Sequence, residues 1–298
     1  MIKAIIVGYG NIGKFALEAL FEAKDFEIAG IVSSHADAEK NPELKNIQVV
    51  KKFSELKIKP DIAILCSPSR DIADTAKEYL KNGINTVDSF DMHQSIVNVR
   101  REIDKAAKEA GKVSIMSAGW DPGLDSVVRA LLEAAAPKGI TYTNFGPGMS
   151  MGHSVAVKAV KGVKKALSIT IPLGSSIHRR MVYVETEEGF DFNDIAKKIK
   201  ADAYFAGDET HVIKVEDVDA LKDMGHGVNL MRKGVSGKTH NQMFEFNMKI
   251  NNPALTAQIL VSAARASMKQ KPGCYTMIEI PMIDMLYGDK EELIKRFV

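Results

Sequence analysis

Short apolar runs alternate with amphipathic stretches along the first 118 residues of the chain. The apolar runs are rich in β-branched residues, as buried strands are, and the stretches between them have helical length. This alternation predicts right-handed βαβ units, and therefore a parallel sheet with helices on both faces. The predicted strands are Ala4–Val7, Ile28–Val32, Ile62–Cys66, Thr86–Val87 and Val113–Met116, and the predicted helices are Ile12–Ala23, Asp71–Asn82 and Ile96–Ala110.

The pattern changes after Ala118. A helix is predicted over Leu124–Ala136, and it ends at a proline. Polar and apolar residues then alternate with period two in Met181–Glu185, His211–Val215 and Gln242–Ile250. Such alternation is typical of antiparallel strands with one face in water. We therefore expect a second, α+β domain.

The C-terminal part opens with a further helix. Asn252-Pro253 places a capping residue before a proline at the first helical position, and the helix is expected to reach about Lys269. The tail after it contains another apolar run, Thr276–Ile280. We expect the tail, residues 265–298, to rejoin residues 1–118 in one domain, and residues 119–264 to form the other.

Length, composition and charge narrow the classes of function. A chain of 298 residues suggests two domains at roughly 100–200 residues each. With 45% hydrophobic and 26% charged residues, the composition is that of a globular protein. The 40 Lys and Arg residues against 38 Asp and Glu leave a net charge of +2, which gives no support to nucleic-acid binding. No apolar run approaches the roughly 20 residues that span a bilayer, so no membrane partner is expected.

The N-terminal sequence and the cysteine content predict a cytoplasmic location. Met1-Ile2-Lys3 leads directly into an apolar run, without a basic segment or a small-residue cleavage site. Cys66 and Cys274 are too few for a disulfide framework, and the seven histidines lack metal-binding spacing. We expect a reduced protein without a metal site.

A glycine-rich motif follows the first predicted strand. Gly8-Tyr9-Gly10-Asn11-Ile12-Gly13 matches G-x-G-x-x-G between a strand and a helix, where a dinucleotide-binding loop belongs. Gly8 would allow a tight turn, Gly10 the approach of a pyrophosphate, and Gly13 close packing of helix on strand. The predicted fold class is therefore α/β, a Rossmann-type doubly wound parallel sheet plus a second α+β domain. A glycine-rich turn in another α/β protein is the alternative.

Residues after the second strand indicate which dinucleotide binds. NAD enzymes usually carry an acidic residue there, whereas this chain has Ser33-Ser34-His35, whose hydroxyl and imidazole groups suit a 2′-phosphate. NADP is therefore favoured. NAD remains an alternative, because the segment lacks an arginine and Asp37 could bind ribose hydroxyls. Cys66-Ser67-Pro68-Ser69 ends a later strand and is expected to flank the cofactor, with an ordinary turn as the alternative.

Two acidic residues follow the next two strands. Asp91 comes after Thr86–Val87, and Asp121, beside the single tryptophan Trp120, comes after Val113–Met116. Because the carboxyl ends of parallel strands share one edge, both carboxylates are expected near the reacting end of a nicotinamide. There they could bind an ammonium group and accept its protons. Helix capping is the alternative role for both aspartates, and a core position the alternative for Trp120.

The second domain carries groups that suit a carboxylate. Arg180 offers a planar fork of donors, and Thr170 and His226 add further ones. Asn252 is fully explained as a helix cap. From spacing alone, surface or capping roles are the simpler explanation for these residues.

The longer motifs together resemble the meso-diaminopimelate dehydrogenase family. In chain order, the matching segments are GYGNIG, DSFDMH, SAGWDPG, NFGPGMSMGHS and NNPALTAQ. The resemblance implies reversible, NADP-dependent deamination of the D-centre of meso-2,6-diaminopimelate to L-2-amino-6-oxopimelate and ammonia, in lysine and cell-wall precursor metabolism. It also implies a cytoplasmic homodimer, in which residues 119–264 bind the substrate and the second copy.

The resemblance also implies residue roles. Asp91 and Asp121 would bind the amine of the D-centre, and either could be the base. The other substrate residues would be Trp120 and Phe145 lining the pocket, Met151 and Gly152 near the reacting centre, and Thr170, Arg180, His226 and Asn252 at the distal L-centre.

Three alternative functions remain. A related NAD(P)-dependent D-amino-acid dehydrogenase of broader specificity is the nearest, because Met151 stands where some members have glutamine and the region around Ile177–Arg180 is compact. Ser34-His35 stands where many members have arginines, which leaves the use of both NADP and NAD open. A non-catalytic NADP-binding regulator would bind the cofactor without turnover. Gly148-Met149-Ser150-Met151-Gly152 also matches the G-x-S-x-G of serine hydrolases, although the family motif already accounts for this loop.

Overall fold

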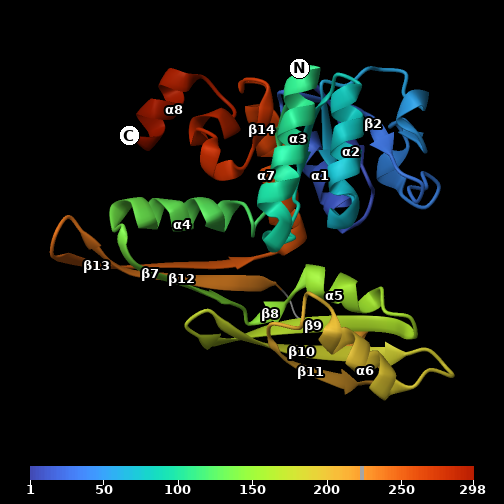
Figure 1. The fold of residues 1–298 in the computed structure, drawn as a ribbon. Coiled ribbons are helices and arrows are strands. Elements are labelled where there is room, and N and C mark those ends of the chain that lie inside the picture. Colours follow the sequence, from blue (N-terminus) through green and yellow to red (C-terminus); the bar gives the residue numbers. More distant parts are fainter. Residues whose placement is uncertain (222–224) are drawn as a thin grey trace. The chain divides into compact units, whose positions relative to one another are not determined.

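The computed structural model describes residues 1–221 and 225–298 of the chain, which divide into two compact units (Figure 1). Unit 1 comprises Met1–Val128 and Pro253–Val298, and unit 2 comprises Arg129–Asn252. The sequence predicts the two boundaries after residues 118 and 264. The structure has them at 128 and 252, within one helix and just after the first residue of another.

Unit 1 is built on a seven-stranded parallel sheet in the order β3–β2–β1–β4–β5–β6–β14. Strands β2 and β3 lie on one side of β1, and β4, β5, β6 and β14 lie on the other. This change of side next to the first strand is typical of Rossmann folds. The strands are β1 (Ile2–Val7), β2 (Phe26–Val32), β3 (Val49–Val50), β4 (Ile62–Leu65), β5 (Asn85–Asp88), β6 (Val113–Ile115) and β14 (Gly273–Tyr275).

Helices cover both faces of this sheet, because side chains alternate between its faces. Ile6 packs among residues of α1 and α7, whereas Ile5 packs among residues of α2 and α3, which Figure 1 shows on the near side. The helices of unit 1 are α1 (Asn11–Glu22), α2 (Ser69–Lys81), α3 (Ile96–Ala110), α7 (Asn252–Ser267) and α8 (Lys290–Phe297), and α4 (Leu124–Ala135) runs from unit 1 into unit 2.

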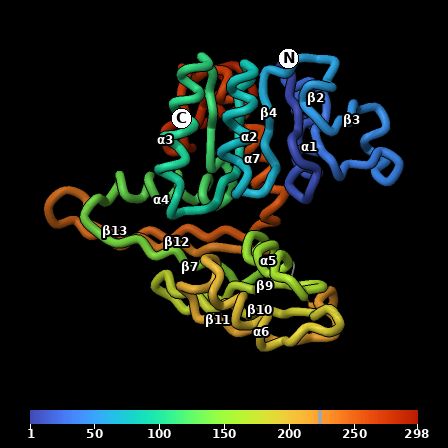
Figure 2. The backbone as a smooth tube through the Cα atoms, turned by 45° about the vertical axis from the view of Figure 1, so that its right-hand side comes forward, coloured from blue at the N-terminus to red at the C-terminus, as the bar shows by residue number. Residues whose placement is uncertain are grey.

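The predicted strands and helices of the first 118 residues are all present, within a few residues at each end. The tail rejoins this sheet, as Figure 2 shows for the red C-terminal backbone. The strand it contributes is Gly273–Tyr275, paired with β6. The apolar run Thr276–Ile280 instead contains a 3-10 turn, in which Met277 is buried.

Unit 2 contains two sheets. The four-stranded sheet has the order β11–β10–β9–β8, and α5 and α6 pack on it through Val157, Ile195 and Ile199. The three-stranded sheet has the order β13–β12–β7 and is antiparallel throughout. The elements are β7 (Lys138–Phe145), β8 (Gly148–Met149), α5 (Met151–Lys158), β9 (Val163–Gly174), β10 (Ile177–Thr186), α6 (Phe192–Ala201), β11 (Glu209–Lys214), β12 (His226–Ser236) and β13 (His240–Ile250).

One pairing differs from the expected antiparallel pattern. β10 pairs antiparallel with β9 but parallel with β11, with Arg180 opposite Thr210. The cause is α6, which lies between β10 and β11 and returns the chain to the same end of the sheet, as a parallel connection requires. A period-two pattern shows which residues of a strand share a face. The pattern is the same whether the strand pairs parallel or antiparallel with its neighbour.

Candidate functional site

The glycine-rich loop of unit 1 has the geometry of a phosphate-binding turn. Gly8 has a φ of +93°, and a Cβ there would lie 2.9 Å from the carbonyl oxygen of Cys66. A Cβ at Gly13 would lie 2.2 Å from the Gly8 carbonyl oxygen. A Cβ at Gly10, by contrast, would lie more than 4 Å from every atom of the described residues other than its chain neighbours and its own helix. The space beside Gly10 is therefore open.

The start of α1 can accept an anion. Gly10 occupies the N-cap position and contributes no side-chain hydrogen bond to the helix. The first amides of α1, from Asn11 and Ile12 onward, therefore carry the partial positive charge and the donors that bind phosphate groups. These residues fit a pyrophosphate, which the sequence predicted for this loop.

Tyr9, unlike its glycine neighbours, makes contacts through its side chain. Its hydroxyl donates to Glu43 Oε1 at 2.8 Å, and the side chain is buried. Burial, followed by this carboxylate, raises the pKa of Tyr9. The phenol therefore stays protonated at neutral pH and acts as a hydrogen-bond donor.

The segment after β2 forms its own turn. Ser34 Oγ is hydrogen-bonded to His35 Nδ1 at 3.0 Å, and the His35 amide donates to Ser33 Oγ at 3.2 Å. The Glu39 amide donates to Asp37 Oδ1 at 2.9 Å and is the main cause of the lowered pKa of Asp37. Ser34 and His35 are exposed at the end of this strand, where the sequence predicted 2′-phosphate ligands.

The segment after β4 connects the predicted cofactor loop to one of the predicted acids. Ser67 and Pro68 lead into α2, whose first residue, Ser69, donates its hydroxyl to Asp91 Oδ1 at 2.7 Å. Desolvation raises the pKa of the Cys66 thiol to about 12, so this thiol is neutral. The hydroxyl of Ser69 thus donates to the Asp91 carboxylate, a contact that cannot be predicted from the sequence.

Both predicted acids lie in loops at the carboxyl edge of the unit 1 sheet. Asp91 follows β5 and Asp121 follows β6. His93, two residues after Asp91, has its Nε2 3.7 Å from Asp121 Oδ2, so the two loops lie together. Beside them, Trp120 is buried and its amide donates to Thr256 Oγ1 at 3.3 Å. The sequence did not single out His93, which this contact brings into the site.

In unit 2, strand pairing brings Arg180 and Thr170 together. They are directly opposite in β10 and β9, and Arg180 Nη1 donates to Thr170 Oγ1. Arg180 Nε donates to Asp208 Oδ2 at 2.6 Å. A guanidinium has five N–H donors, so these two bonds fix its orientation and use only part of its capacity. Asp208 was missed in the sequence, because it lies 28 positions away and only the fold brings it here.

Aromatic and imidazole rings gather near Arg180. The Phe145 amide donates to His178 Nε2 at 2.8 Å. The rings of Phe145 and His226 are nearly parallel, with their centroids 6.5 Å apart. Burial and then the Arg180 charge lower the pKa of His178. The same two causes lower the pKa of His153 to about 3. These two imidazoles are therefore neutral at pH 7, and the guanidinium carries the positive charge.

The remaining predicted residues lie at helix starts. Met151 and Gly152 form the first turn of α5 and are partly buried, and Asn252 is the first residue of α7. Ser150 Oγ is hydrogen-bonded to His153 Nδ1 at 2.7 Å, which is the arrangement a hydrolase nucleophile would need. A histidine with a pKa near 3 is a weak base, however, and this opposes that interpretation.

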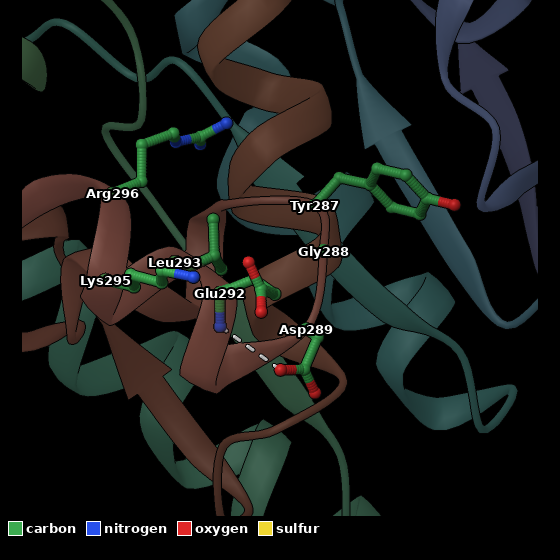
Figure 3. Close-up of a pocket in the computed structure, with 7 residues that line it drawn as sticks. All are labelled: Tyr287, Gly288, Asp289, Glu292, Leu293, Lys295 and Arg296. Carbon is green, nitrogen blue, oxygen red and sulfur yellow. Dashed lines mark hydrogen bonds between the residues drawn. The ribbon is translucent and has the colours of Figure 1, made fainter.

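Unit 1 also has a surface pocket of about 420 Å³ at the C-terminal segment (Figure 3). Its lining residues, from Tyr287 to Arg296, include none of the predicted site residues. Asp289 accepts hydrogen bonds from the amides of Glu291 and Glu292, so it caps α8.

Two findings concern residues 1–221 and 225–298 as a whole. They contain no cluster of three or more His, Cys, Asp or Glu side chains arranged to hold a metal ion. In the same residues, no helix has the length and apolar character needed to cross a membrane.

The chain is similar to proteins of known function along its whole length. Residues 2–116 match the family described as "Oxidoreductase family, NAD-binding Rossmann fold". Residues 119–179 match the "Diaminopimelic acid dehydrogenase C-terminal domain". A meso-diaminopimelate D-dehydrogenase from Bacteroides fragilis is 65% identical over 297 residues, covering 100% of this chain and 99% of the relative.

Solved structures confirm the fold class. The DAP dehydrogenase of C. glutamicum in complex with DAP has a TM-score of 0.88 at 28% identity, covering 100% of this chain and 99% of that one. An engineered D-amino acid dehydrogenase bound to NADP+ has a TM-score of 0.85 at 26% identity, with the same coverage. The predicted Rossmann-type sheet with a second α+β domain is thus correct.

Proposed function

The chain belongs to the meso-diaminopimelate D-dehydrogenase family, and from this premise we propose that it reversibly deaminates the D-centre of meso-2,6-diaminopimelate with NADP. The products are L-2-amino-6-oxopimelate and ammonia. We also propose a cytoplasmic enzyme of lysine and cell-wall precursor metabolism, as the family resemblance implies. One observation carries the proposed chemistry: the loops of Asp91 and Asp121 follow adjacent strands of the dinucleotide-binding sheet.

The glycine-rich loop would hold the cofactor. The open space beside Gly10 and the free amides at the start of α1 suit its pyrophosphate, and Ser33, Ser34 and His35 suit its 2′-phosphate. When bound, the nicotinamide supplies the carbon that accepts a hydride from the D-centre. The structure of an NADP+-bound engineered relative supports this choice over NAD.

Asp91 and Asp121 would bind the D-centre as an ammonium group and take up its proton. Hydride loss from carbon requires a nitrogen lone pair, so the amine must first be deprotonated. The acceptor is Asp91 or Asp121. After hydride loss, water adds to the substrate imine and ammonia leaves. Trp120, Phe145, Met151 and Gly152 would shape the surroundings of the reacting centre.

Arg180 would bind the carboxylate of the distal L-centre. Thr170 and Asp208 hold its guanidinium in one orientation, and charge-assisted hydrogen bonds to a carboxylate are the strongest that such a group makes. His226 and Asn252 would add polar contacts. Because two of the neighbouring histidines are neutral, they offer hydrogen bonds without repelling the second ammonium group of the substrate.

One spectrophotometric assay at 340 nm tests the proposal. The meso, LL and DD isomers of diaminopimelate are each supplied with NADP and, separately, with NAD. We expect NADPH formation with the meso isomer and none with the LL isomer, which lacks a D-centre. Faster reduction of NAD would overturn the cofactor assignment. Faster turnover of simple D-amino acids would favour the broader-specificity alternative, and cofactor binding without turnover would favour a regulator.

We further propose that the protein is a homodimer. One face of the three-stranded sheet exposes Ile140 (51%) and Met243 (63%), which lie on either side of Lys233. Glu245 is on the same face, two positions along β13 from Met243. In a two-fold arrangement Lys233 of each copy can meet Glu245 of the other, so the face is complementary to itself.

A further inference from the structure

We propose that Asp88 is a positioning residue, whose buried carboxylate holds the loops of Asp91 and Asp121 in place for catalysis. None of the roles assigned above includes it. The inference rests on the proposed function, because it concerns the two carboxylates that would bind and deprotonate the amine.

Asp88 is hydrogen-bonded to both loops. Its Oδ1 accepts from the Phe90 amide at 2.9 Å and from the Ser117 amide at 3.2 Å. Its backbone carbonyl accepts from the Ala118 amide at 2.8 Å. Phe90 immediately precedes Asp91, and Ser117 and Ala118 open the segment that leads to Asp121. One residue at the end of β5 therefore fixes the start of each acid-bearing loop.

Burial makes these bonds hard to replace. Asp88 is fully buried, and its Oδ2 has no hydrogen-bond partner among the described residues. Burial raises the pKa of Asp88 to about 6, although the Phe90 and Ser117 amides act in the opposite direction. The carboxylate is thus ionised at neutral pH, where amides bind it more strongly than they bind a neutral acceptor. Bulk solvent does not reach the side chain.

The Ser117 loop needs such support. Ser117 has a φ of +54°, in the left-handed region that residues with a Cβ rarely adopt. Beyond it, Gly119–Leu124 forms a tight turn, in which the Gly119 amide donates to the Pro122 carbonyl at 3.1 Å and its own carbonyl accepts from the Leu124 amide at 3.0 Å. Because this turn is internally hydrogen-bonded, a displacement at Ser117 would move Asp121 with it.

Three substitutions distinguish the effect of the position of the Asp88 carboxylate from the effect of its charge. Asp88→Asn keeps an acceptor oxygen for both amides and removes the charge. Asp88→Ala removes the acceptor, and Asp88→Ser offers an oxygen one bond too short to reach both amides. The matched control is Thr86→Val on the same strand, where an equally buried hydroxyl donates to Ser114 Oγ at 2.9 Å and contacts neither loop.

We expect Asp88→Ala and Asp88→Ser to lower kcat/KM for diaminopimelate by about 100-fold, since misplacing reacting groups by about 1 Å costs that much. The dissociation constant for NADP should stay within about twofold, because the phosphate loop is elsewhere on the sheet. Asp88→Asn should keep kcat/KM within about threefold of the wild type, although it lowers the melting temperature. Thr86→Val should lower the melting temperature and leave kcat/KM unchanged.

Two outcomes would overturn the inference. If Asp88→Asn loses as much kcat as Asp88→Ala, the charge and not the position of the carboxylate matters. If Asp88→Ala and Asp88→Ser stay active, the loops do not need Asp88. Amide hydrogen exchange of Phe90 and Ser117 reports positioning without turnover: protection should fall in Asp88→Ala and persist in Asp88→Asn. An inactive wild type with these exchange results would refute the proposed function alone.

Discussion

At the scale of single residues, the charge states around Arg180 decide what the second unit can bind. Arg180 is a permanent cation fixed by Asp208 and Thr170, whereas burial and the guanidinium charge keep His153 and His178 neutral at pH 7. Such a group selects a carboxylate by the direction of its N–H donors as well as by charge. The proposed binding of the distal carboxylate therefore depends on Arg180 more than on the imidazoles around it.

Replacing Arg180 tests this dependence. Arg180→Met should lower kcat/KM for meso-diaminopimelate by about 100-fold, because the substrate loses the contact that orients it. NADP affinity should not change. The neighbouring Arg179→Met is the matched control, since Arg179 is more exposed and pairs with Glu209 at 2.9 Å. Equal activity of Arg180→Met and wild type on diaminopimelate would refute the assignment.

At the scale of elements, the β1–α1 connection combines a packing requirement with a binding requirement. Gly13 lies where a side chain would collide with the Gly8 carbonyl, so it governs how closely the helix meets the turn. Gly10 has a φ of −85°, which any residue can adopt, and it faces open space. The two glycines therefore serve different purposes within one motif.

Two alanine substitutions should separate these purposes. Gly13→Ala should lower the free energy of unfolding by roughly 1–3 kcal/mol, because the new methyl group forces backbone atoms apart. Gly10→Ala should leave thermal unfolding nearly unchanged but raise the dissociation constant for NADP by about tenfold, since the methyl group occupies space that a pyrophosphate would need. Thermal denaturation and cofactor titration of both variants check this, and a reversed pattern would contradict it.

At the scale of the whole molecule, the exposed face of the three-stranded sheet calls for an explanation. Ile140 and Met243 are large apolar side chains exposed on the face that also carries Lys233 and Glu245. Large apolar side chains exposed near one another on a sheet face can belong to a protein–protein contact. A second copy of the chain would cover this face and pair Lys233 with Glu245.

Met243→Lys should therefore weaken self-association. A lysine there would place a new positive charge opposite its own copy across a two-fold axis, beside Lys233. Sedimentation velocity over a range of protein concentrations should show a wild-type dimer and a variant that dissociates on dilution. Ile213→Lys, on the edge strand β11 of the same unit, is the control and should behave like wild type. A monomeric wild type would refute the dimer.

The sequence by itself determined the architecture of the first unit and the position of its phosphate loop. Strands such as Ile62–Leu65 are buried on both faces, and the helices between them have their own periodicity, so local pattern suffices. The order of strands then places Asp91 and Asp121 at one edge of the sheet. The motifs along both units likewise identified the family. In unit 2, however, periodicity alone could not give the direction in which β11 pairs with β10.

Only the tertiary structure decided which side chains support the predicted ones. Asp208 meets Arg180, Ser69 meets Asp91, and His93 approaches Asp121 through contacts between residues far apart in the chain or on separate loops. Asp88 stands within a recognisable motif, but its role depends on the Ser117 amide, 29 positions away. Which groups are buried and which hydrogen-bond to each other depends on where the backbone folds back on itself. The periodicity of the sequence does not show which distant residues this brings together.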